Sequence, residues 1–342
     1  MTRLKLVEDG ISISQGNGIT VTTPSFSISL DPRSASDCDY SFVSHAHIDH
    51  VHLPNGKSKV IASKETKELA KARGYDLGKS NHEISGIELY DSGHILGSRA
   101  ILIKDRVLYT GDLSTRDRAF LKGCDVVKCE TLIIESTYGR GHYVFPETGN
   151  LISQVNKFIS ECFDNCRPVV LTGYPLGKAQ LLSYLFDMWE PIYVYDSIHS
   201  MNNGHIKLGV ELKEFEPFSS TKEFQEKIGR GPWVLIAPSS GGKSNLVKTM
   251  KERYNAVIAT FTGWAIDSRY RNSLSSDKAF PMSDHCDFQE LVNFVKGCDP
   301  SKVYTVHGFS DEFAAYLRRL GYDAEPLDAA TDPQFKLTNF AT

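Results

Sequence analysis

The sequence predicts an α/β protein whose first domain is interrupted by a second α/β domain. Up to about residue 148, the chain reads as short apolar strands separated by turns. From about 150 to 263, strands and helices alternate, which is typical of a sheet covered by helices. Histidines in settings that suit metal binding occur both before and after this segment, so the chain is expected to return to its first domain.

The first segment contains several strands and one clear helix. Apolar residues at 40–43, 106–110 and 131–134 predict strands, and a turn begins where each run stops. A helix is expected over 64–73, because Gly74 supplies the residue type that most readily adopts the left-handed conformation ending a helix.

The interrupting segment alternates between helices and strands. Apolar spacing predicts, in order, a helix at 154–163, a strand at 168–172, a helix at 178–189, strands at 192–195 and 233–237, a helix at 244–254 and a strand at 256–260.

The last segment is expected to pack back against the first. Helices are predicted at 288–295 and 311–320, with Ser310 capping the second helix. His285 and His307 are useful only near the other candidate metal ligands. The predicted division is therefore 1–148 for the first part of one domain, 149–268 for the inserted domain and 269–342 for the return.

Composition indicates an ordinary globular protein and excludes few functions. Of 342 residues, 41% are hydrophobic and 23% are charged, and the formal net charge is −4. This charge argues against a broad electrostatic grip on polyanions, so nucleic acid would be bound locally. Two short basic clusters could guide a strand, although solvated helix and loop faces are the simpler interpretation. These clusters contain Lys64, Lys67, Lys71 and Arg73, and Arg116 and Arg118.

Cysteine usage and hydropathy predict a cytoplasmic protein without a membrane segment. The seven cysteines form no Cys-x-x-Cys pair and are odd in number, which favours reduced thiols. No apolar run approaches the length that spans a bilayer, and the amino terminus lacks the apolar stretch of a signal peptide.

The segment Ser44–His50, Ser-His-Ala-His-Ile-Asp-His, has the spacing of a metal site. In extended chain, His45 and His47 lie on one face and can converge on one cation, while Asp49 and His50 face a second. A solvated histidine-rich loop is the alternative. Ligand-type residues in matching settings downstream favour the metal site.

Two further candidate ligands occur in glycine-flanked turns. His94 lies in Asp-Ser-Gly-His-Ile-Leu-Gly-Ser at 91–98, and Asp112 follows the strand at 106–110 as a candidate bridging carboxylate. Histidines and carboxylates in this number suit two zinc ions with open positions for water, and Mn²⁺ is an alternative metal.

These three motifs resemble, in order, the metal motifs of the metallo-β-lactamase fold. The resemblance implies an αββα sandwich, here with an inserted α/β domain. Lactamases, thioesterases and nucleases share these ligands, so the superfamily alone does not define the substrate.

Three later motifs resemble the β-CASP group of nucleic-acid-processing hydrolases. They are Glu-Ser-Thr-Tyr-Gly at 135–139, the segment 281–288 with His285, and the segment 303–308 with His307. Together with the metal motifs, the resemblance extends from Asp31 to about Leu327.

The β-CASP resemblance implies a role for each site residue. His45, His47 and His94 would hold one zinc, Asp49, His50 and His307 the other, and Asp112 would bridge them. Hydroxide supplied at the ions would attack the phosphodiester. Asp49 and Asp112 thus count among the catalytic residues. His285 would act as the general acid, and Glu135 would orient it.

Two segments of the inserted domain resemble DNA exonucleases associated with bacterial DNA ligases and related archaeal mRNA 3′-end processing factors. These are Gly-Tyr-Pro-Leu-Gly-Lys-Ala-Gln at 173–180 and Thr-Phe-Thr-Gly-Trp at 260–264, followed by Arg269 and Arg271. DNA cross-link repair nucleases have related elements but typically carry an aliphatic residue where this chain has His307. A histidine there is typical of RNA-cleaving members, although the ligase-associated family shares it.

The resulting hypothesis is a repair exonuclease acting on single-stranded or end-exposed DNA. An RNA nuclease of the 3′-end processing type is the first alternative, and a non-catalytic scaffold is the second. The expected partners are single-stranded DNA or RNA and a DNA ligase or processing factor, with no membrane.

Four residues in the inserted domain or directly after it are candidates for substrate binding. Gly177 and Lys178 begin a helix and could hold a phosphate, with a surface lysine as the alternative. Trp264 could stack on a base, although a core role is the more common one for tryptophan. Arg269 completes this set.

Overall fold

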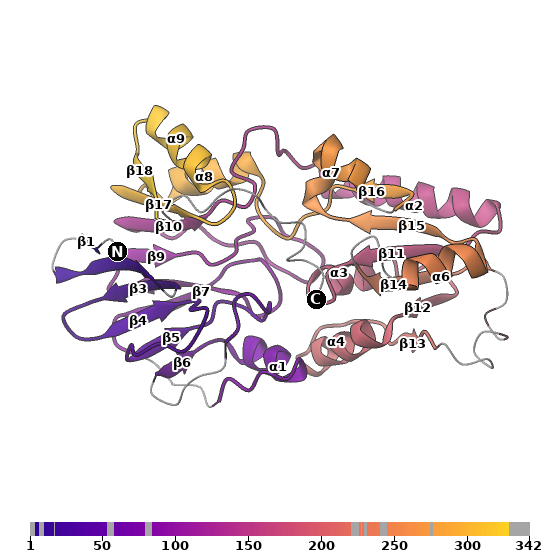
Figure 1. Cartoon of the computed structure of the whole chain (residues 1–342), viewed down its shortest axis with the longest axis horizontal. Coiled ribbons are helices and arrows are strands. Elements are labelled where there is room, and N and C mark those ends of the chain that lie inside the picture. The colour runs from indigo at the N-terminus through magenta and orange to yellow at the C-terminus, as the bar shows by residue number, and fades with distance from the viewer. Residues whose placement is uncertain are drawn as a thin grey trace. The chain divides into compact units, whose positions relative to one another are not determined.

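The protein is described by a computed structural model that places residues 4–6, 10–16, 18–52, 58–78, 84–219, 226, 228, 231–239, 245–273 and 276–327 (Figure 1). Ser244, the predicted start of one helix, lies outside these residues. By packing, the first unit contains the described residues up to Asp117, Leu121–Gly141 and the described residues from His285 to Leu327. The second unit contains Arg118–Phe120 and His142–Asp284.

The first unit contains two six-stranded mixed sheets. The first sheet has, in spatial order, β1 (Leu4–Leu6), β2 (Ser12–Gly16), β3 (Gly18–Thr22), β4 (Ser27–Leu30), β5 (Tyr40–Phe42) and β6 (Lys59–Ile61). The second sheet has β18 (Asp323–Pro326), β17 (Lys302–Val306), β10 (Thr131–Glu135), β9 (Val107–Tyr109), β8 (Arg99–Ile103) and β7 (Ile87–Asp91).

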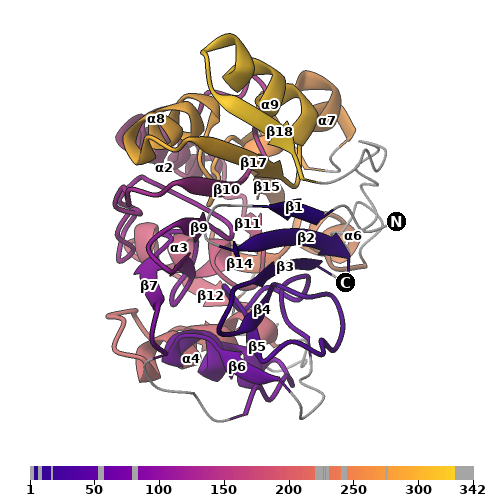
Figure 2. The same ribbon diagram turned by 90° about the vertical axis from the view of Figure 1, so that its left-hand side faces the viewer.

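An apolar core joins these two sheets face to face. Ile13 and Ile28 of the first sheet share one buried cluster with Ile101 and Ile133 of the second. The opposite face of the second sheet is covered by α8 (Phe288–Cys298) and α9 (Ser310–Arg319), as Figure 2 shows. A further helix, α1 (Lys64–Ala72), follows β6 at about the predicted position.

The starts of the two covering helices differ. Asp287 caps α8, because its carboxylate accepts a hydrogen bond from the backbone N–H of Glu290 at 2.9 Å and the Glu290 side chain accepts one in return. The prediction that Ser310 caps the next helix is wrong. Ser310 is its first helical residue, and Phe309 at the cap position provides no side-chain hydrogen bond.

Strands β9, β10 and β17 are parallel neighbours. Glu135, the last residue of β10, lies opposite Val306, the last residue of β17. The carboxyl ends of these strands therefore meet at one edge of the sheet, and residues that follow them are brought together there. Asp112 and His307 are two such residues.

The second unit is built around a parallel sheet with helices on both faces. Its strands, in spatial order, are β13 (Glu216–Pro217), β12 (Ile192–Val194), β14 (Val234–Pro238), β11 (Val169–Gly173), β15 (Val257–Phe261) and β16 (Lys278–Phe280). Its helices are α2 (Thr148–Asp164), α3 (Lys178–Leu185), α4 (Asp196–Lys207), α6 (Asn245–Tyr254), the 3₁₀ turn η2 (Gly263–Ile266) and α7 (Ser268–Ser273).

Alternate residues of the central strands of this sheet enter two separate cores. Val169 and Leu171 pack with Leu151 of α2 and Leu182 of α3, whereas Val170 packs on the other face with Met250 of α6. This alternation explains the continuous apolar runs that predicted buried strands.

The boundaries of the second unit differ from the predicted divisions at 148/149 and 268/269. The chain enters it at His142 and leaves it after Asp284. β16 accounts for most of the second difference, because it extends the sheet of this unit by pairing with β15. Within the described part of the chain, no helix is both long enough and apolar enough to cross a bilayer.

The core of the second unit gives a test of its packing. Leu171 is fully buried in β11 (0% exposed), so Leu171→Ala should lower the free energy of unfolding by about 2–5 kcal/mol. Urea unfolding followed by circular dichroism measures this loss. Met188→Ala, at a side chain that is 69% exposed, should change stability by less than about 0.5 kcal/mol. Equal effects of the two substitutions would contradict the assignment of the core.

Candidate metal centre

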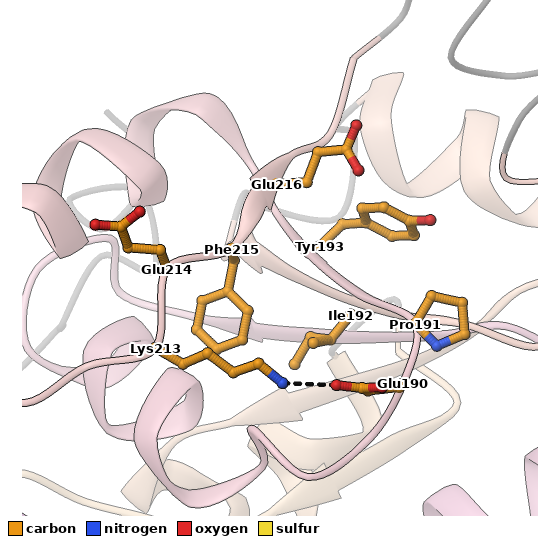
Figure 3. Close-up of a pocket in the computed structure, with 8 residues that line it drawn as sticks. All are labelled: Glu190, Pro191, Ile192, Tyr193, Lys213, Glu214, Phe215 and Glu216. Atoms are coloured by element: carbon orange, nitrogen blue, oxygen red, sulfur yellow. Dashed lines mark hydrogen bonds and ion pairs between the residues drawn. The ribbon is translucent and has the colours of Figure 1, made fainter.

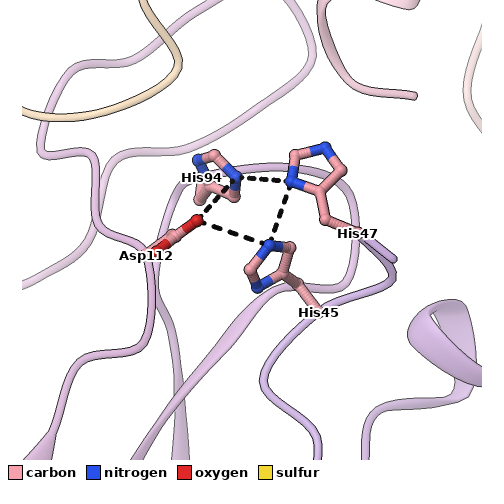
Figure 4. A group of neighbouring side chains, drawn as sticks. All are labelled: His45, His47, His94 and Asp112. Atoms are coloured by element: carbon pink, nitrogen blue, oxygen red, sulfur yellow. Dashed lines mark hydrogen bonds and ion pairs between the residues drawn. The ribbon is translucent and has the colours of Figure 1, made fainter. Parts of the chain in front are cut away.

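Three histidines and one aspartate of the first unit converge on one point (Figure 4). One ligand atom from each of His45, His47, His94 and Asp112 lies within 4.8 Å of the others. The Nδ1 of His47 lies 3.0 Å from the Nε2 of His45 and 3.1 Å from the Nε2 of His94. The Oδ2 of Asp112 lies 3.5 Å from each of these Nε2 atoms. The sequence analysis predicted all four residues.

The ends of strands place these side chains. His45 and His47 follow β5, and Asp112 follows β9. His94 lies in the turn between the antiparallel strands β7 and β8. His45 and His94 are buried and His47 is half-buried, so the cluster opens to solvent on the His47 side.

Ser44 fixes the proton of His45. The hydroxyl of Ser44 donates its only hydrogen to the carboxylate of Asp31 at 2.6 Å, so it can only accept from the Nδ1 of His45 at 2.9 Å. The proton of neutral His45 is therefore on Nδ1, and its Nε2 presents a lone pair to the cluster. Binding of a metal through Nε2 requires this tautomer.

Asp31 is a buried residue that the sequence analysis missed as part of the site. Its carboxylate accepts hydrogen bonds from the backbone N–H of Ser44 at 2.7 Å, from the hydroxyl of Tyr109 at 2.8 Å and from the Nδ1 of His50 at 2.9 Å. Burial raises the pKa of Asp31, but His50 and the hydrogen bonds outweigh burial, and the net pKa is lowered. Asp31 directly follows β4, as Asp112 follows β9. The same signal, a carboxylate after a strand, identified Asp112 and could have revealed Asp31.

His50 begins a second group of candidate ligands. Its Nε2 lies 3.7 Å from the Oδ2 of Asp112 and 3.8 Å from the Oδ2 of Asp49. Burial lowers the pKa of His50, but Asp112, Asp31 and Asp49 outweigh this effect and raise the pKa to about 10. A cation facing Nε2 would take the place of the proton that these carboxylates attract.

His307 lies beside this second group. Its ring centroid is 5.9 Å from that of His50, and its backbone has the left-handed φ of 60°. Gly308 follows with φ of 55°, and a Cβ on it would collide with the backbone of Ser136 and Thr137. The strained turn therefore aims His307 inward. Its Nε2 is buried and has no hydrogen-bond partner among the described residues. This is expected of a nitrogen that binds a metal ion.

His285 and Glu135 form a hydrogen-bonded pair next to Asp112. The Nδ1 of His285 lies 2.9 Å from the Oε1 of Glu135, and its Nε2 lies 4.0 Å from the Oδ2 of Asp112. Burial raises the pKa of Glu135, but His285 and hydrogen bonds from Thr137 and Leu113 outweigh it, so the net pKa is lowered. An ionised Glu135 can only accept, so His285 carries its proton on Nδ1 when neutral. Its Nε2 is then the atom that exchanges a proton.

The candidate substrate residues of the second unit have varied surroundings. Lys178 is buried (2% exposed), and its Nζ lies 2.8 Å from the Oδ1 of Asp284, so it is not the surface lysine of the alternative interpretation. Gly177 precedes α3 with φ of 88°. Trp264 is half-buried and packs edge-on against Tyr143. The side chain of Arg269 is exposed and pairs with Asp267 at 3.1 Å.

A surface hollow of the second unit has different chemistry (Figure 3). An ion pair of 2.8 Å between Lys213 and Glu190 crosses one side of it. The lining contains carboxylates and apolar groups but neither histidine nor cysteine. The residues are Glu190, Pro191, Ile192, Tyr193, Lys213, Glu214, Phe215 and Glu216.

The donor set of the first unit fits a divalent transition metal such as zinc. Three imidazole nitrogens with one carboxylate are typical zinc ligands, and the proton on the Nδ1 of His45 leaves its Nε2 free to bind. The buried Nε2 of His307 is a further donor without a protein partner in the described structure.

Comparison with known proteins agrees with this site. Residues 278–325 match the family model of the Zn-dependent metallo-hydrolase RNA specificity domain. A probable DNA ligase of Opitutus terrae is 34% identical over 300 residues, which are 83% of this chain and 28% of that protein. An RNase J-like protein of Methanocaldococcus jannaschii is 25% identical over 79% of this chain and 81% of its own length.

Two further matches concern a larger protein and a solved structure. The cleavage and polyadenylation specificity factor subunit 3 of Dictyostelium discoideum is 25% identical over 71% of this chain and 37% of that protein. A crystal structure of a protein of unknown function from Enterococcus faecalis V583 has a TM-score of 0.55, with 13% identity and 95% coverage of both chains. This last likeness concerns the fold alone.

These matches confirm the predicted resemblance to the β-CASP nucleases of the metallo-β-lactamase fold. The predicted fold, a metallo-β-lactamase sandwich interrupted by an α/β domain, is thereby confirmed. The chain spans little more than a quarter of the probable DNA ligase, because the match covers 28% of that protein.

The metal centre can be tested through one ligand. His94→Ala removes one of the four converging donors, so we expect zinc affinity to fall by at least about 100-fold. Competition with a coloured chelator measures this change without any substrate. His142→Ala, at an exposed histidine of the second unit, should leave the affinity unchanged. Wild-type affinity in the His94 variant would exclude this residue as a ligand.

A substitution of Asp31 tests whether its hydrogen bonds orient the metal ligands. Asp31→Asn keeps the size of the side chain but removes the negative charge that accepts hydrogen bonds from Ser44, His50 and Tyr109. Zinc affinity should fall by about 10- to 100-fold, as for other groups that orient metal ligands. The measurement is the same chelator competition, on protein whose circular dichroism shows that it is folded. An unchanged affinity in that folded protein would contradict the role given to Asp31.

Proposed function

We propose that this chain is a metal-dependent nuclease that hydrolyses phosphodiester bonds in single-stranded or end-exposed DNA. The observation that carries the proposal is the His285–Glu135 pair, which lies beside the converging ligands His45, His47, His94 and Asp112. Metal held by the converging ligands would supply hydroxide for attack on a phosphate, and the adjacent pair would supply a proton to the leaving group.

The ligand set divides as the family resemblance implies. His45, His47 and His94 would hold one ion, Asp49, His50 and His307 would hold a second, and Asp112 would reach both. Bound metal would lower the pKa of water and stabilise the charge of the phosphate. Two zinc ions are the proposed complement. The short distances from Asp112 to His45, His94 and His50 support the shared position of this carboxylate.

His285 is proposed as the general acid. Glu135 accepts the Nδ1 proton and fixes the ring, which leaves Nε2 to protonate the departing oxygen. Glu135 is fully buried, whereas the side chain of His285 is 21% exposed, so only the imidazole can reach a substrate. Glu135 is therefore a positioning residue that acts through His285.

DNA is proposed as the substrate because of the relative that shares 34% identity, which is named a probable DNA ligase. The segments around Gly177, Lys178, Trp264 and Arg269, which resemble ligase-associated exonucleases, support the same choice. Arg269 is the most exposed of these four and suits contact with a phosphate. A DNA ligase is the proposed partner, and a cytoplasmic location remains a prediction from the cysteines.

RNA is the second candidate substrate. It is favoured by the match of residues 278–325 to an RNA specificity domain and by relatives named for RNA processing. His307, which is typical of RNA-cleaving members, lies in this matched segment. A non-catalytic scaffold has less support, because the four converging donors and the His285–Glu135 pair are all present.

The experiment uses zinc-loaded protein and matched single-stranded DNA and RNA oligonucleotides, each labelled separately at either end. His285→Ala should retain its zinc but reduce kcat by about 10²- to 10⁴-fold, as expected for loss of a general acid. Product ladders resolved by gel electrophoresis give the rate, the preferred nucleic acid and the direction of cleavage.

Asp112→Ala and His142→Ala serve as the inactive and active controls. Faster Asp112-dependent trimming of DNA would support the proposal, and faster cutting of RNA would support the second candidate. Cleavage of neither by the zinc-loaded wild type would contradict the nuclease assignment. Full activity of His285→Ala would exclude this residue as the acid.

A further inference from the structure

Helix α1 carries polar groups at both ends that reach out of the helix. Ser63 is its N-cap, and the Ser63 hydroxyl accepts a hydrogen bond from the backbone N–H of Thr66 at 2.9 Å. The helix ends at Arg73, whose backbone N–H donates to the carbonyl of Ala70 at 3.0 Å. Thr66, Leu69 and Ala70 form its buried face. At 9 residues, the helix spans about 13 Å between these ends.

The first end of α1 contacts the loop that carries His94. The hydroxyls of Ser63 and Thr66 both donate to the carbonyl of Gly97, at 2.7 and 2.9 Å. Gly97 lies three residues after His94 and has φ of 81°. A Cβ on Gly97 would lie 2.8 Å from the Ser63 hydroxyl and would collide with Glu65. The loop and the helix end are therefore in close contact, and both lone pairs of one carbonyl are used.

The other end of α1 contacts the loop that carries His45 and His47. The Nη1 of Arg73 donates to the carbonyl of Ala46 at 2.9 Å. Ala46 lies between the two histidines and is itself buried (1% exposed).

The two metal-ligand loops are thus held by opposite ends of one short helix. We infer that α1 is a brace that fixes the distance between the His94 loop and the His45–His50 loop, and that Arg73 is a positioning residue of the metal centre. This inference rests on the proposed function only in that the bound metal serves catalysis. The hydrogen bonds of the brace involve no side chain of a metal ligand. The brace therefore acts only on the positions of the ligands.

This role separates Arg73 from the lysines of the same basic cluster. Lys64 and Lys71 are exposed on the helix, as expected of solvated charges, whereas Arg73 is partly buried against the Ala46 carbonyl. Arginine suits this position because its planar group presents N–H donors in a fixed geometry, and Nη1 donates to the Ala46 carbonyl. Lysine provides one compact ammonium group and would replace only part of this function.

Zinc affinity of four variants tests the brace. Arg73→Met should weaken zinc binding by about 10- to 100-fold, the usual loss when a group that orients metal ligands is removed. Arg73→Lys should recover part of this loss. Thr66→Val removes one of the two bonds to Gly97 at nearly constant volume, so it should cause a smaller loss. Lys71→Met, at an exposed position of the same helix, should bind zinc as the wild type does.

A spectroscopic measurement distinguishes positioning from simple destabilisation. With Co²⁺ in place of zinc, the visible absorption bands report ligand geometry, and we expect Arg73→Met to change their position or intensity while Lys71→Met does not. Unchanged affinity and unchanged Co²⁺ bands in Arg73→Met would overturn the inference. An equal loss in Lys71→Met would also overturn it. If Arg73→Met does not fold, wild-type affinity in both Arg73→Lys and Thr66→Val would overturn it.

These measurements use only metal ions and no nucleic acid. A wild-type protein that binds zinc tightly but cleaves no oligonucleotide would refute the proposed function and leave the brace intact. Conversely, an active nuclease whose zinc affinity is insensitive to Arg73 would refute the brace alone.

Discussion

The metal centre depends on the hydrogen bonds that the buried carboxylate of Asp31 accepts. Asp31 follows β4 of one sheet and accepts hydrogen bonds from Tyr109 of the facing sheet, from Ser44 and from His50. Through Ser44 it also determines which nitrogen of His45 carries a proton. A buried charge is tolerated only when it is paired and hydrogen-bonded, so the packing of the two sheets and the state of the ligands are set by the same group.

The chemistry of the site follows from parallel strands that end at one edge. Glu135 ends β10, and Asp112 and His307 follow β9 and β17, so residues from distant parts of the sequence meet without a long loop between them. Three of the imidazoles at the site have a partner that fixes the orientation of the ring. Ser44 supports His45, Asp31 supports His50, and Glu135 supports His285. These partners determine which ring nitrogen carries the proton and which nitrogen presents a lone pair before a metal or substrate binds.

The sequence predicted what depends on local spacing and missed what depends on distant partners. The spacing from His45 to His50 identified candidate ligands, and apolar periodicity located six helices and the central strands of the inserted sheet. Asp31 was not recognised as part of the site, because its partners are 13, 19 and 78 residues away. Lys178 was predicted from a helix start, but its ion pair with Asp284, 106 residues away, has no local signal. The edge strands β13 and β16 have only 2 and 3 residues, too few for a periodic pattern.

The interruption of the first unit by the second determines when the site can form during synthesis. All described strands of the second unit's sheet lie between His142 and Asp284, so this sheet is available as soon as that stretch has emerged from the ribosome. The first unit must wait, because β10 pairs with β17 and both α8 and α9 cover its core. Its early strands therefore remain without these partners while the whole inserted domain is made. The ligands near residue 45 can meet His307 only after the inserted unit and β17 have been made, so a chain that stops before β17 would carry a folded insert without a complete metal centre.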